Sequence, residues 1–323
     1  MRALVTGSSG FIGGHVVAAL VAAGAQVRAF DAAAPPDGLP DGAEFVRGDV
    51  LDVDAVRRAL EGCEAVFHLA ALYSYARADA ARMQAVNVDG TRTVLRAAAN
   101  GAQRRIVHTS SCATCGPVRG RRADERDLPD RSQLDVPYKR TKLDGERLAL
   151  SAAREGHQVV VVNPTVPVGP GDRRPTPTGK MVADVAHGRA RAYLASSALN
   201  VVAVQDVAAG HVMAFERGRA GERYLLGGED LSIRDVFAVI ATAAGRPAPR
   251  VGIPWVAAFA GARIADAALR PLGREPRMLL VDEVRAGRFA HLFDDSKARA
   301  ELGYSSRSAA DALATAARDA IAG

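Results

Sequence analysis

Tyr138 and Lys142 stand four positions apart in the stretch VPYKRTKLDG, residues 136–145. On a helix this spacing places both side chains on one face. A lysine ammonium close to a tyrosine hydroxyl favours the phenolate, because an opposite charge lowers a pKa that is ordinarily about 10. Such a pair can exchange a proton with a substrate hydroxyl. The alternative interpretation is a surface pair without a chemical role.

Two serines, Ser110 and Ser111, could complete a catalytic group. They end the stretch RRIVHTSS, which we expect to form a strand over 104–111. Ligand sites of parallel α/β sheets lie at the carboxyl ends of the strands, and the helix with Tyr138 begins shortly afterwards. A serine hydroxyl at this edge would hydrogen-bond the reacting oxygen, and both serines are candidates.

A glycine-rich turn follows the first predicted strand in VTGSSGFIGG. Gly7 allows the tight turn, Gly10 lets the backbone approach a pyrophosphate, and Gly13 permits close packing of helix and strand. The next helix would present free N–H groups and its positive end to the phosphates. This pattern predicts a bound dinucleotide, and a glycine-rich turn without a ligand is the alternative.

Acidic residues follow the second and third predicted strands. Asp31 could accept hydrogen bonds from both ribose hydroxyls and would repel a 2′-phosphate, which predicts NAD rather than NADP. Asp49 could bind the adenine amine, whereas Asp52 fits better as a helix N-cap. The expected cofactor contacts are Gly7, Gly10, Phe11, Ile12, Gly13, Asp31, Asp49, Val50, Leu69, Ala70, Ala71, Tyr138, Lys142 and Asn163.

Six strand-like runs alternate with helical stretches up to residue 164, which predicts an α/β fold with a doubly wound parallel sheet. We expect this part, residues 1–164, to bind NAD and to carry the catalytic residues. The remainder, 165–323, opens on a Pro- and Gly-rich stretch and should form a smaller, interleaved substrate lobe. Because VVAVQDV resembles a strand of the sheet, we expect about 198–215 to return to the first domain.

Composition excludes several classes of protein. The net charge is +6, but the basic residues are dispersed along the 323 positions, so we expect no nucleic-acid partner. No apolar run reaches the roughly 20 residues of a membrane span and no signal peptide is recognisable, which predicts a cytoplasmic protein. Three cysteines argue against a disulfide framework, and the lone CxxC of Cys112 and Cys115 predicts no metal site.

The motifs TGSSGFIG, FHLAA and NVDGT, with the serine-rich strand end and the YxxxK pair, resemble extended short-chain dehydrogenases/reductases, the NAD-dependent epimerase/dehydratase superfamily. The resemblance implies a Rossmann-type fold, NAD as cofactor and transient hydride transfer at a carbinol carbon. Placing Cys115–Gly116 on the family's usual Tyr–Gly implies that Ser111 is the catalytic serine, with Ser110 as the fallback. Lys142, together with the positive pyridinium of oxidised NAD, would favour the phenolate of Tyr138, and it would also hold the nicotinamide ribose.

The stretches NPTVPVGPGDRRPTPTGK and LNVVAVQDVAAGHVMAFERGRAGERYLLGGED are similar to hopanoid-associated sugar epimerases of bacteria. The implied function is an NAD-dependent epimerase of a sugar carried by a nucleotide or a hopanoid. The alternative is an NAD(P)H-dependent reductase of an aldehyde, ketone or steroid-like alcohol, as in the neighbouring dihydroflavonol-reductase-like branch. A non-enzymatic dinucleotide sensor is disfavoured, because such proteins often lose the YxxxK pair.

Departures from the family concern the substrate. Cys115 stands where many sugar-nucleotide epimerases have tyrosine, and Ala203 and Gln205 replace the His and the first Asp of a HVDDVA motif. By analogy with relatives, helices at about 78–100 and 135–156 would form a homodimer interface.

Two further polar residues have expected places near the cofactor. His68 should pack at a strand end, and Asn87 should bond backbone or order water beside the tyrosine, as in similar enzymes. The substrate is expected to be a small molecule that contains a sugar. Its expected contacts are Tyr73, Tyr75, Ser111, Asn163, Thr176 and Thr178.

Overall fold

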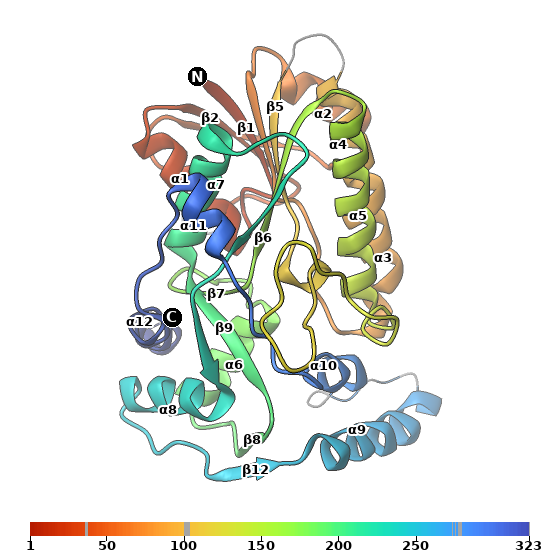
Figure 1. Ribbon diagram of the computed structural model, residues 1–323, viewed down its shortest axis with the longest axis vertical. Coiled ribbons are helices and arrows are strands. Elements are labelled where there is room, and N and C mark those ends of the chain that lie inside the picture. Colours follow the sequence, from red (N-terminus) through yellow and green to blue (C-terminus); the bar gives the residue numbers. More distant parts are fainter. Residues whose placement is uncertain (36–37, 100–103, 273, 275, 277–279, 323) are drawn as a thin grey trace.

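The computed structural model describes residues 1–35, 38–99, 104–272, 274, 276 and 280–322. Its main sheet is built from β1 (Arg2–Thr6), β2 (Gln26–Asp31), β3 (Ala43–Arg47), β4 (Ala65–His68), β5 (Arg105–Thr109), β6 (Gln158–Pro164) and β10 (Arg223–Leu226). The order is β10-β6-β5-β4-β1-β2-β3, and every neighbouring pair is parallel (Figure 1). This confirms the predicted doubly wound sheet. The strand order reverses between β1 and β4, where such sheets bind their ligands.

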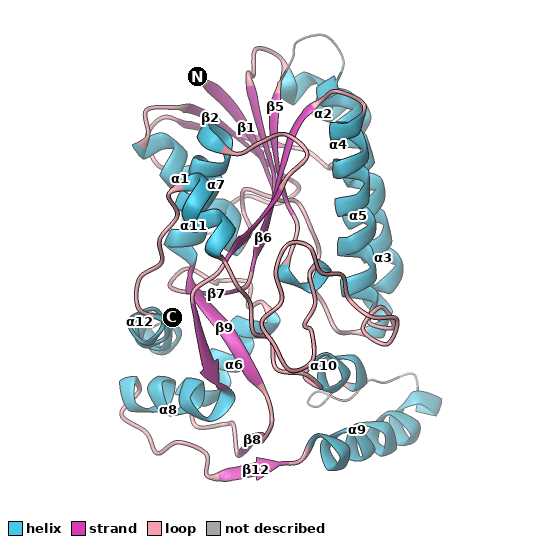
Figure 2. Ribbon diagram, viewed as in Figure 1, coloured by secondary structure: helices cyan, strands magenta, loops and turns pink. Residues whose placement is uncertain are grey.

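Helices cover both faces of this sheet (Figure 2). One face carries α1 (Phe11–Ala22), α7 (Val204–Arg217) and α11 (Ser296–Leu302), and the other carries α2 (Val53–Leu60), α4 (Thr91–Ala99) and α5 (Pro137–Arg154). Strand β6 contributes to the apolar core on both faces of the sheet. Its residues 159–162 are four buried valines whose side chains alternate between the core under α1 and α7 and the core under α2, α4 and α5. Burying one such side chain contributes roughly 1.5–3 kcal/mol.

The predicted helix over about 78–100 is divided in the structure. It consists of η1 (Arg77–Asp79), α3 (Ala80–Gln84), the π turn η2 (Ala85–Gly90) and α4; its expected end at residue 100 lies outside the described residues. Asn87 lies in the π turn, where its Oδ1 accepts the N–H of Leu72 at 2.7 Å and its Nδ2 donates to Thr141 Oγ1 at 3.0 Å. This confirms the prediction that Asn87 forms a hydrogen bond with the backbone. It also ties the segment after β4 to α5.

A second group of elements lies beyond the carboxyl ends of the main strands. A sheet of β7 (Val166–Val168), β9 (Ala198–Ala203) and β11 (Glu229–Ser232) packs with α6 (Pro177–Ala186), α8 (Ile233–Ala243) and α12 (Ala309–Ala322). This part of the chain also holds β8 (Ala192–Leu194), β12 (Val251–Ile253), α9 (Trp255–Leu269), η4 (Arg270–Leu272) and α10 (Val281–Ala286), with β12 and α9 at the lower end of Figure 1. Within the described ranges, no helix combines the length and the hydropathy needed to cross a membrane.

The expectation that VVAVQDV supplies a strand of the main sheet is wrong. The first part of this stretch ends β9, which pairs with β7 and β11, and Val204 already begins α7. The seventh strand of the main sheet is instead β10, which has only four residues and lies parallel to β6. Helices α7 and α11 do pack in the apolar cluster with α1, so later segments complete the layers of the main sheet.

A buried carboxylate joins α5 to the strand ends. Glu146 is 1% exposed and accepts hydrogen bonds from Thr114 Oγ1 at 2.7 Å and Asn163 Nδ2 at 2.6 Å. It also forms an ion pair of 2.8 Å with Arg223 Nη1 at the start of β10. Removing one partner of a buried ion pair leaves an uncompensated charge, which costs far more than losing an exposed pair.

We expect Arg223→Met to lower the free energy of unfolding by about 3–5 kcal/mol, because Glu146 would stay buried without its cation. Arg219→Met is the matched control. Its pair with Glu301 is more exposed, so its loss should cost about 1 kcal/mol or less. Urea unfolding of both variants measures the difference, and equal costs would contradict the importance of the buried pair.

Candidate active site

The glycine-rich turn folds tightly between β1 and α1. Gly7 has a φ of 72°, which glycine adopts without strain, and a Cβ there would lie 2.5 Å from Ala70 N. A Cβ on Gly13 would lie 2.0 Å from Gly7 O, so a larger residue would push helix and turn apart. Gly10 caps α1 without a side-chain bond to the first amides of the helix. The turn therefore forms the narrow cradle that a pyrophosphate needs.

Asp31 ends β2 beside this turn. Its Oδ2 accepts the N–H of Ser9 at 3.0 Å, and its Oδ1 accepts the N–H of Ala33 at 3.1 Å. The carboxylate is thus fixed at the rim of the turn, where the ribose of a dinucleotide is expected. Asp49 is exposed and accepts a backbone N–H two residues further on, while Asp52 caps α2 as predicted.

A buried histidine supports the turn. His68 Nδ1 lies 2.7 Å from Thr6 Oγ1, and His68 Nε2 lies 3.0 Å from Thr91 Oγ1. Burial lowers the pKa of His68 to about 3, so the ring stays neutral near pH 7 and a role as general base is disfavoured. The other predicted cofactor contacts border the turn or nearby strand ends: Phe11 and Ile12 open α1, Val50 follows β3, and Leu69, Ala70 and Ala71 follow β4.

Tyr138, Ser111 and Lys142 converge at the carboxyl end of β5. Ser111 follows that strand, caps the short helix η3 (Cys112–Thr114) and lies close enough to the Tyr138 hydroxyl to lower its pKa. Lys142 Nζ donates to the last carbonyl of β5 at 2.7 Å. Ser110 Oγ instead lies 3.5 Å from the hydroxyl of Thr114. The geometry therefore favours Ser111 over Ser110 as the partner of the tyrosine.

Burial dominates the protonation of this group. Burial raises the pKa of the Tyr138 hydroxyl above its ordinary value, Tyr73 raises it further, and the hydrogen bond with Ser111 offsets only part of the rise. Burial also lowers the pKa of Lys142 to about 8. In the chain by itself Lys142 does not offset the effect of burial on the pKa of Tyr138, and the expectation that Lys142 and the oxidised cofactor together favour the phenolate stays a prediction. A further positive charge beside the hydroxyl is needed to favour the phenolate.

Tyr73 and Tyr75, which we call the aromatic wall, lie beside Tyr138. The ring centroids of Tyr73 and Tyr138 are 4.2 Å apart at an interplanar angle of 32°. The hydroxyls of Tyr73 and Tyr75 are 3.1 Å apart. Burial raises the pKa of both tyrosines, so the wall is uncharged. The structure thus brings two of the predicted substrate contacts to the reacting hydroxyl.

Asn163 was predicted to touch the nicotinamide or the substrate; its amide nitrogen is engaged inside the protein, whereas its buried Oδ1 has no hydrogen-bond partner in the described part of the chain, so the contact stays a prediction. The residue is fully buried, and its Nδ2 donates to Glu146 Oε2 at 2.6 Å, Thr114 Oγ1 at 2.9 Å and Ser111 O at 3.1 Å. A polar group at a buried strand end needs such partners. Asn163 therefore positions the backbone of Ser111.

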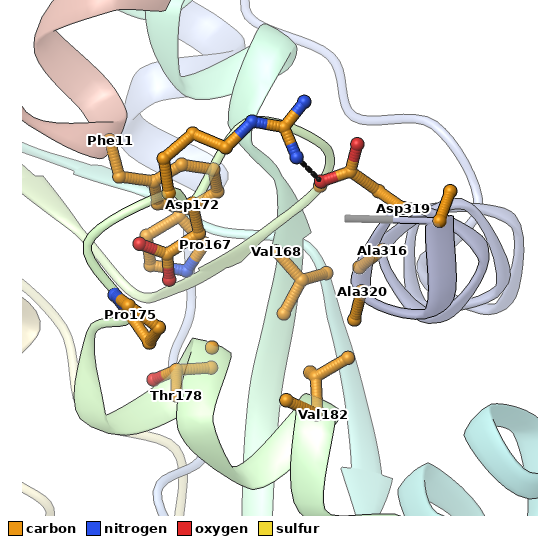
Figure 3. A pocket seen from close by; sticks show the side chains of 15 residues that line it. Phe11, Pro167, Val168, Asp172, Pro175, Thr178, Val182, Ala316, Asp319 and Ala320 are labelled. Atoms are coloured by element: carbon orange, nitrogen blue, oxygen red, sulfur yellow. Dashed lines mark hydrogen bonds and ion pairs between the residues drawn. The ribbon is translucent and has the colours of Figure 1, made fainter. Parts of the chain in front are cut away.

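The two predicted threonine contacts also differ from expectation. Thr176 caps α6, and its Oγ1 accepts a backbone N–H of that helix at 3.0 Å. Thr178 lines a cavity of about 510 Å³ between the loop after β7, α6 and α12 (Figure 3). Phe11 lines the same cavity, and an ion pair of 3.3 Å between Arg173 and Asp319 borders it. The cavity adjoins the glycine-rich turn rather than the catalytic tyrosine.

The cysteines of the CxxC pair are buried free thiols. Burial raises the pKa of Cys112 to about 12, which disfavours the reactive thiolate. Among the residues that the structure describes, no group of three or more His, Cys, Asp or Glu side chains could hold a metal ion.

Lys139 is a buried residue at the site that sequence analysis did not single out. It follows Tyr138 on α5, is 3% exposed and has no hydrogen bond or ion pair with any described residue. Burial lowers its pKa to about 8. The sequence holds little signal for it, because a lysine beside a catalytic tyrosine on a helix is ordinarily solvated.

We expect Lys139→Met to be more stable than the wild type at pH 7 by about 1–3 kcal/mol, because it removes a buried, unpaired charge. Between pH 8 and the ordinary lysine pKa of 10.5, the unfolded wild type binds more protons than the folded wild type, so its stability rises with pH. The advantage of the variant should therefore shrink over this range. Urea unfolding at pH 7, 9 and 10.5 measures it, and a constant difference would contradict burial of a charged Lys139.

Comparison with known proteins extends the likeness over the whole chain. The model of the NAD dependent epimerase/dehydratase family matches residues 3–227. A putative dihydroflavonol 4-reductase of Synechocystis is 38% identical, over 97% of this chain and 92% of its own length. Sterol demethylase protein B of Methylococcus capsulatus is 38% identical, over 79% of this chain and 78% of its own length.

Solved structures also resemble this chain over nearly its whole length. The crystal structure of gox2253 superposes with a TM-score of 0.84 at 36% identity and covers 98% of this chain and 97% of that one. MoeE5 in complex with UDP-glucose and NAD has a TM-score of 0.77 at 26% identity and covers 100% and 99%. Both the match to the family model and the relatives at 38% identity span most of the sequence. This chain therefore belongs to the NAD-dependent epimerase/dehydratase family, among the extended short-chain dehydrogenases/reductases.

Proposed function

We propose that the chain is an NAD-dependent oxidoreductase that interconverts an alcohol and a ketone on a largely apolar substrate. The observation that carries this proposal is the aromatic wall against Tyr138, whose nearer ring centroid is 4.2 Å away. Aromatic rings beside a reacting hydroxyl suit an apolar substrate surface. Cys115 also favours an apolar substrate, because it stands where many sugar-nucleotide epimerases have a tyrosine. The two relatives at 38% identity are named as a reductase and a sterol demethylase.

The glycine-rich turn fits the cofactor of the family, because Cβ atoms at Gly7 and Gly13 would collide with the turn that forms the cradle. The first amides of α1 would hold the phosphates, and Asp31 would hold the ribose hydroxyls. When bound, NAD supplies the acceptor or donor of a hydride and, in its oxidised form, a positive charge.

Residues of the chain transfer the proton of the substrate hydroxyl and bind its oxygen. Tyr138 takes the proton of the substrate hydroxyl in the oxidising direction and returns it in the reducing direction. Ser111 hydrogen-bonds the reacting oxygen and the Tyr138 hydroxyl. Lys142, held at 2.7 Å by the end of β5, places its ammonium where the phenolate forms and stabilises that charge.

A sugar epimerase is the second candidate, and the whole-length likeness to MoeE5 in its complex with UDP-glucose and NAD favours it. An epimerase would use the same three residues, but the hydride would return to the opposite face of the carbon. Such a reaction consumes no NADH overall. The link to hopanoids and the homodimer remain predictions that rest on the family resemblance.

The fate of NADH distinguishes the two candidates. We expect purified protein to oxidise one NADH for each ketone reduced, with a panel of hydrophobic ketones as substrates. Tyr138→Phe should lower kcat by about 10²–10⁴-fold and leave NAD affinity nearly unchanged, because it removes the proton but keeps the ring. The control for the loss of a lysine is Lys180→Met, at an exposed position of α6. Interconversion of UDP-sugars on tightly retained NAD, with no ketone-dependent NADH oxidation, would instead establish the epimerase.

A further inference from the structure

Lys139 is a cation in an unusual place. Its side chain is 3% exposed, whereas Lys180 and Lys297 reach solvent and pair with carboxylates at 2.6 and 2.5 Å. Lys142 is equally buried, but its ammonium is bonded to a carbonyl. No described residue offers Lys139 a hydrogen bond or an ion pair. The Lys139 ammonium is thus largely, though not completely, removed from water without a partner among the described residues, which is costly, and such groups ordinarily find a counterion.

The place of Lys139 on α5 increases this cost. The helix begins at Pro137, so Lys139 is its third residue, and the first turn contains no acidic side chain. The first turn of an 18-residue helix carries the positive end of the helix dipole, which favours anions and disfavours cations. An anion at this place would compensate both the ammonium and the helix end.

His291 supplies a second group without a partner in the neighbourhood of Lys139. His291 Nδ1 is buried and has no hydrogen-bond partner in the described part of the chain. This residue arrives from the C-terminal half through a bridge to Leu199, and it lies within electrostatic range of Lys139. Cys112, next to catalytic Ser111, is also within range of Lys139.

The nearest acidic candidate does not neutralise the ammonium. Asp130 interacts with Lys139 through space but forms no ion pair with it within the described residues. One oxygen of Asp130 already accepts hydrogen bonds from Ser132 Oγ at 2.7 Å and from the N–H of Gln133 at 3.0 Å. The donors of Lys139 are therefore available for a group that no described residue supplies.

We propose that Lys139, together with His291, binds an anionic group of the substrate, a carboxylate or a phosphate, next to the carbon on which Tyr138 acts. The inference rests on the proposed function, because it takes the substrate to lie against Tyr138 and Ser111. Charge-assisted hydrogen bonds from a buried ammonium are strong and directional. The substrate is then an otherwise apolar molecule with an acidic group close to its hydroxyl or keto carbon. With a pKa of about 8, Lys139 is mostly protonated at neutral pH.

Binding can be followed without turnover, because the chain has only four lysines, at positions 139, 142, 180 and 297. NAD-loaded protein carrying [13Cε]lysine is titrated separately with acetate, inorganic phosphate and 3-oxooctanoate, and Lys139→Met assigns the signal. We expect a saturable shift of the Lys139 signal, while Lys180 and Lys297 report general salt effects. A shift with the carboxylates alone, or with phosphate alone, identifies the anion. No shift at Lys139, or one that only parallels Lys180, overturns the proposal.

The carboxylate form is tested further with 3-oxooctanoate and its methyl ester, which differ by one charge. We expect kcat/KM of the wild type with NADH to favour the acid by about 10-fold or more. The preference should fall towards one in Lys139→Met and persist in Lys180→Met. An unchanged preference in Lys139→Met overturns a carboxylate subsite. If neither ketone is reduced, the proposed function fails for these substrates, while the lysine signals still decide whether the anion site exists.

Discussion

The hydrogen-bond cluster around Glu146 determines where the reactive groups stand. The Glu146 carboxylate accepts hydrogen bonds from Thr114 at 2.7 Å and Asn163 at 2.6 Å. It also forms an ion pair with Arg223 at 2.8 Å. These residues come from η3, β6 and β10, while Glu146 itself lies two turns after Tyr138 on α5. Because the carboxylate is almost fully removed from water, each partner must stay in place or leave a costly unsatisfied charge. The cluster thereby fixes the strand end that carries the catalytic serine against the helix that carries the tyrosine and lysine.

Burial around Tyr138 makes catalysis depend on a charge from outside the chain. The hydroxyl lies near the aromatic wall and the buried thiol of Cys112, and burial holds its pKa above the ordinary value. Lys142 is a cation close by, but the same burial lowers its own pKa to about 8. Oxidised NAD carries the additional positive charge, so the dry site that disfavours the phenolate in the free protein strengthens its attraction to the cofactor. In this view, binding of the cofactor and acidity of the tyrosine are coupled.

Sequence reasoning succeeded where function depends on neighbours in the chain. The glycine spacing at Gly7 and Gly13 and the helical spacing of Tyr138 and Lys142 are local patterns, so the turn and the pair could be placed. Strand β10 could not be placed, because its four residues acquire their role only by pairing with β6, about sixty residues earlier.

Polar residues near strand and helix ends were harder to interpret from sequence. Asn163 and Thr176 are predicted ligand contacts, and in the structure they also serve a buried strand end and a helix N-cap, which need polar side chains for the same chemical reason. The sequence offers little indication of Lys139, because the burial of a lysine on a helix depends on tertiary packing that a local pattern does not show. Internal hydrogen bonding and ligand binding require the same residue types, and only the tertiary structure separates them.

The most direct test of this account is the pKa of Tyr138 with and without oxidised NAD. The chain has six tyrosines, so [13Cζ]tyrosine labelling with Tyr138→Phe for assignment allows its titration to be followed by NMR. The account predicts that Tyr138 stays protonated beyond pH 10 in the free protein and ionises at a clearly lower pH once NAD is bound. A pKa at or below about 10 in the free protein, or one that NAD does not lower, would contradict it.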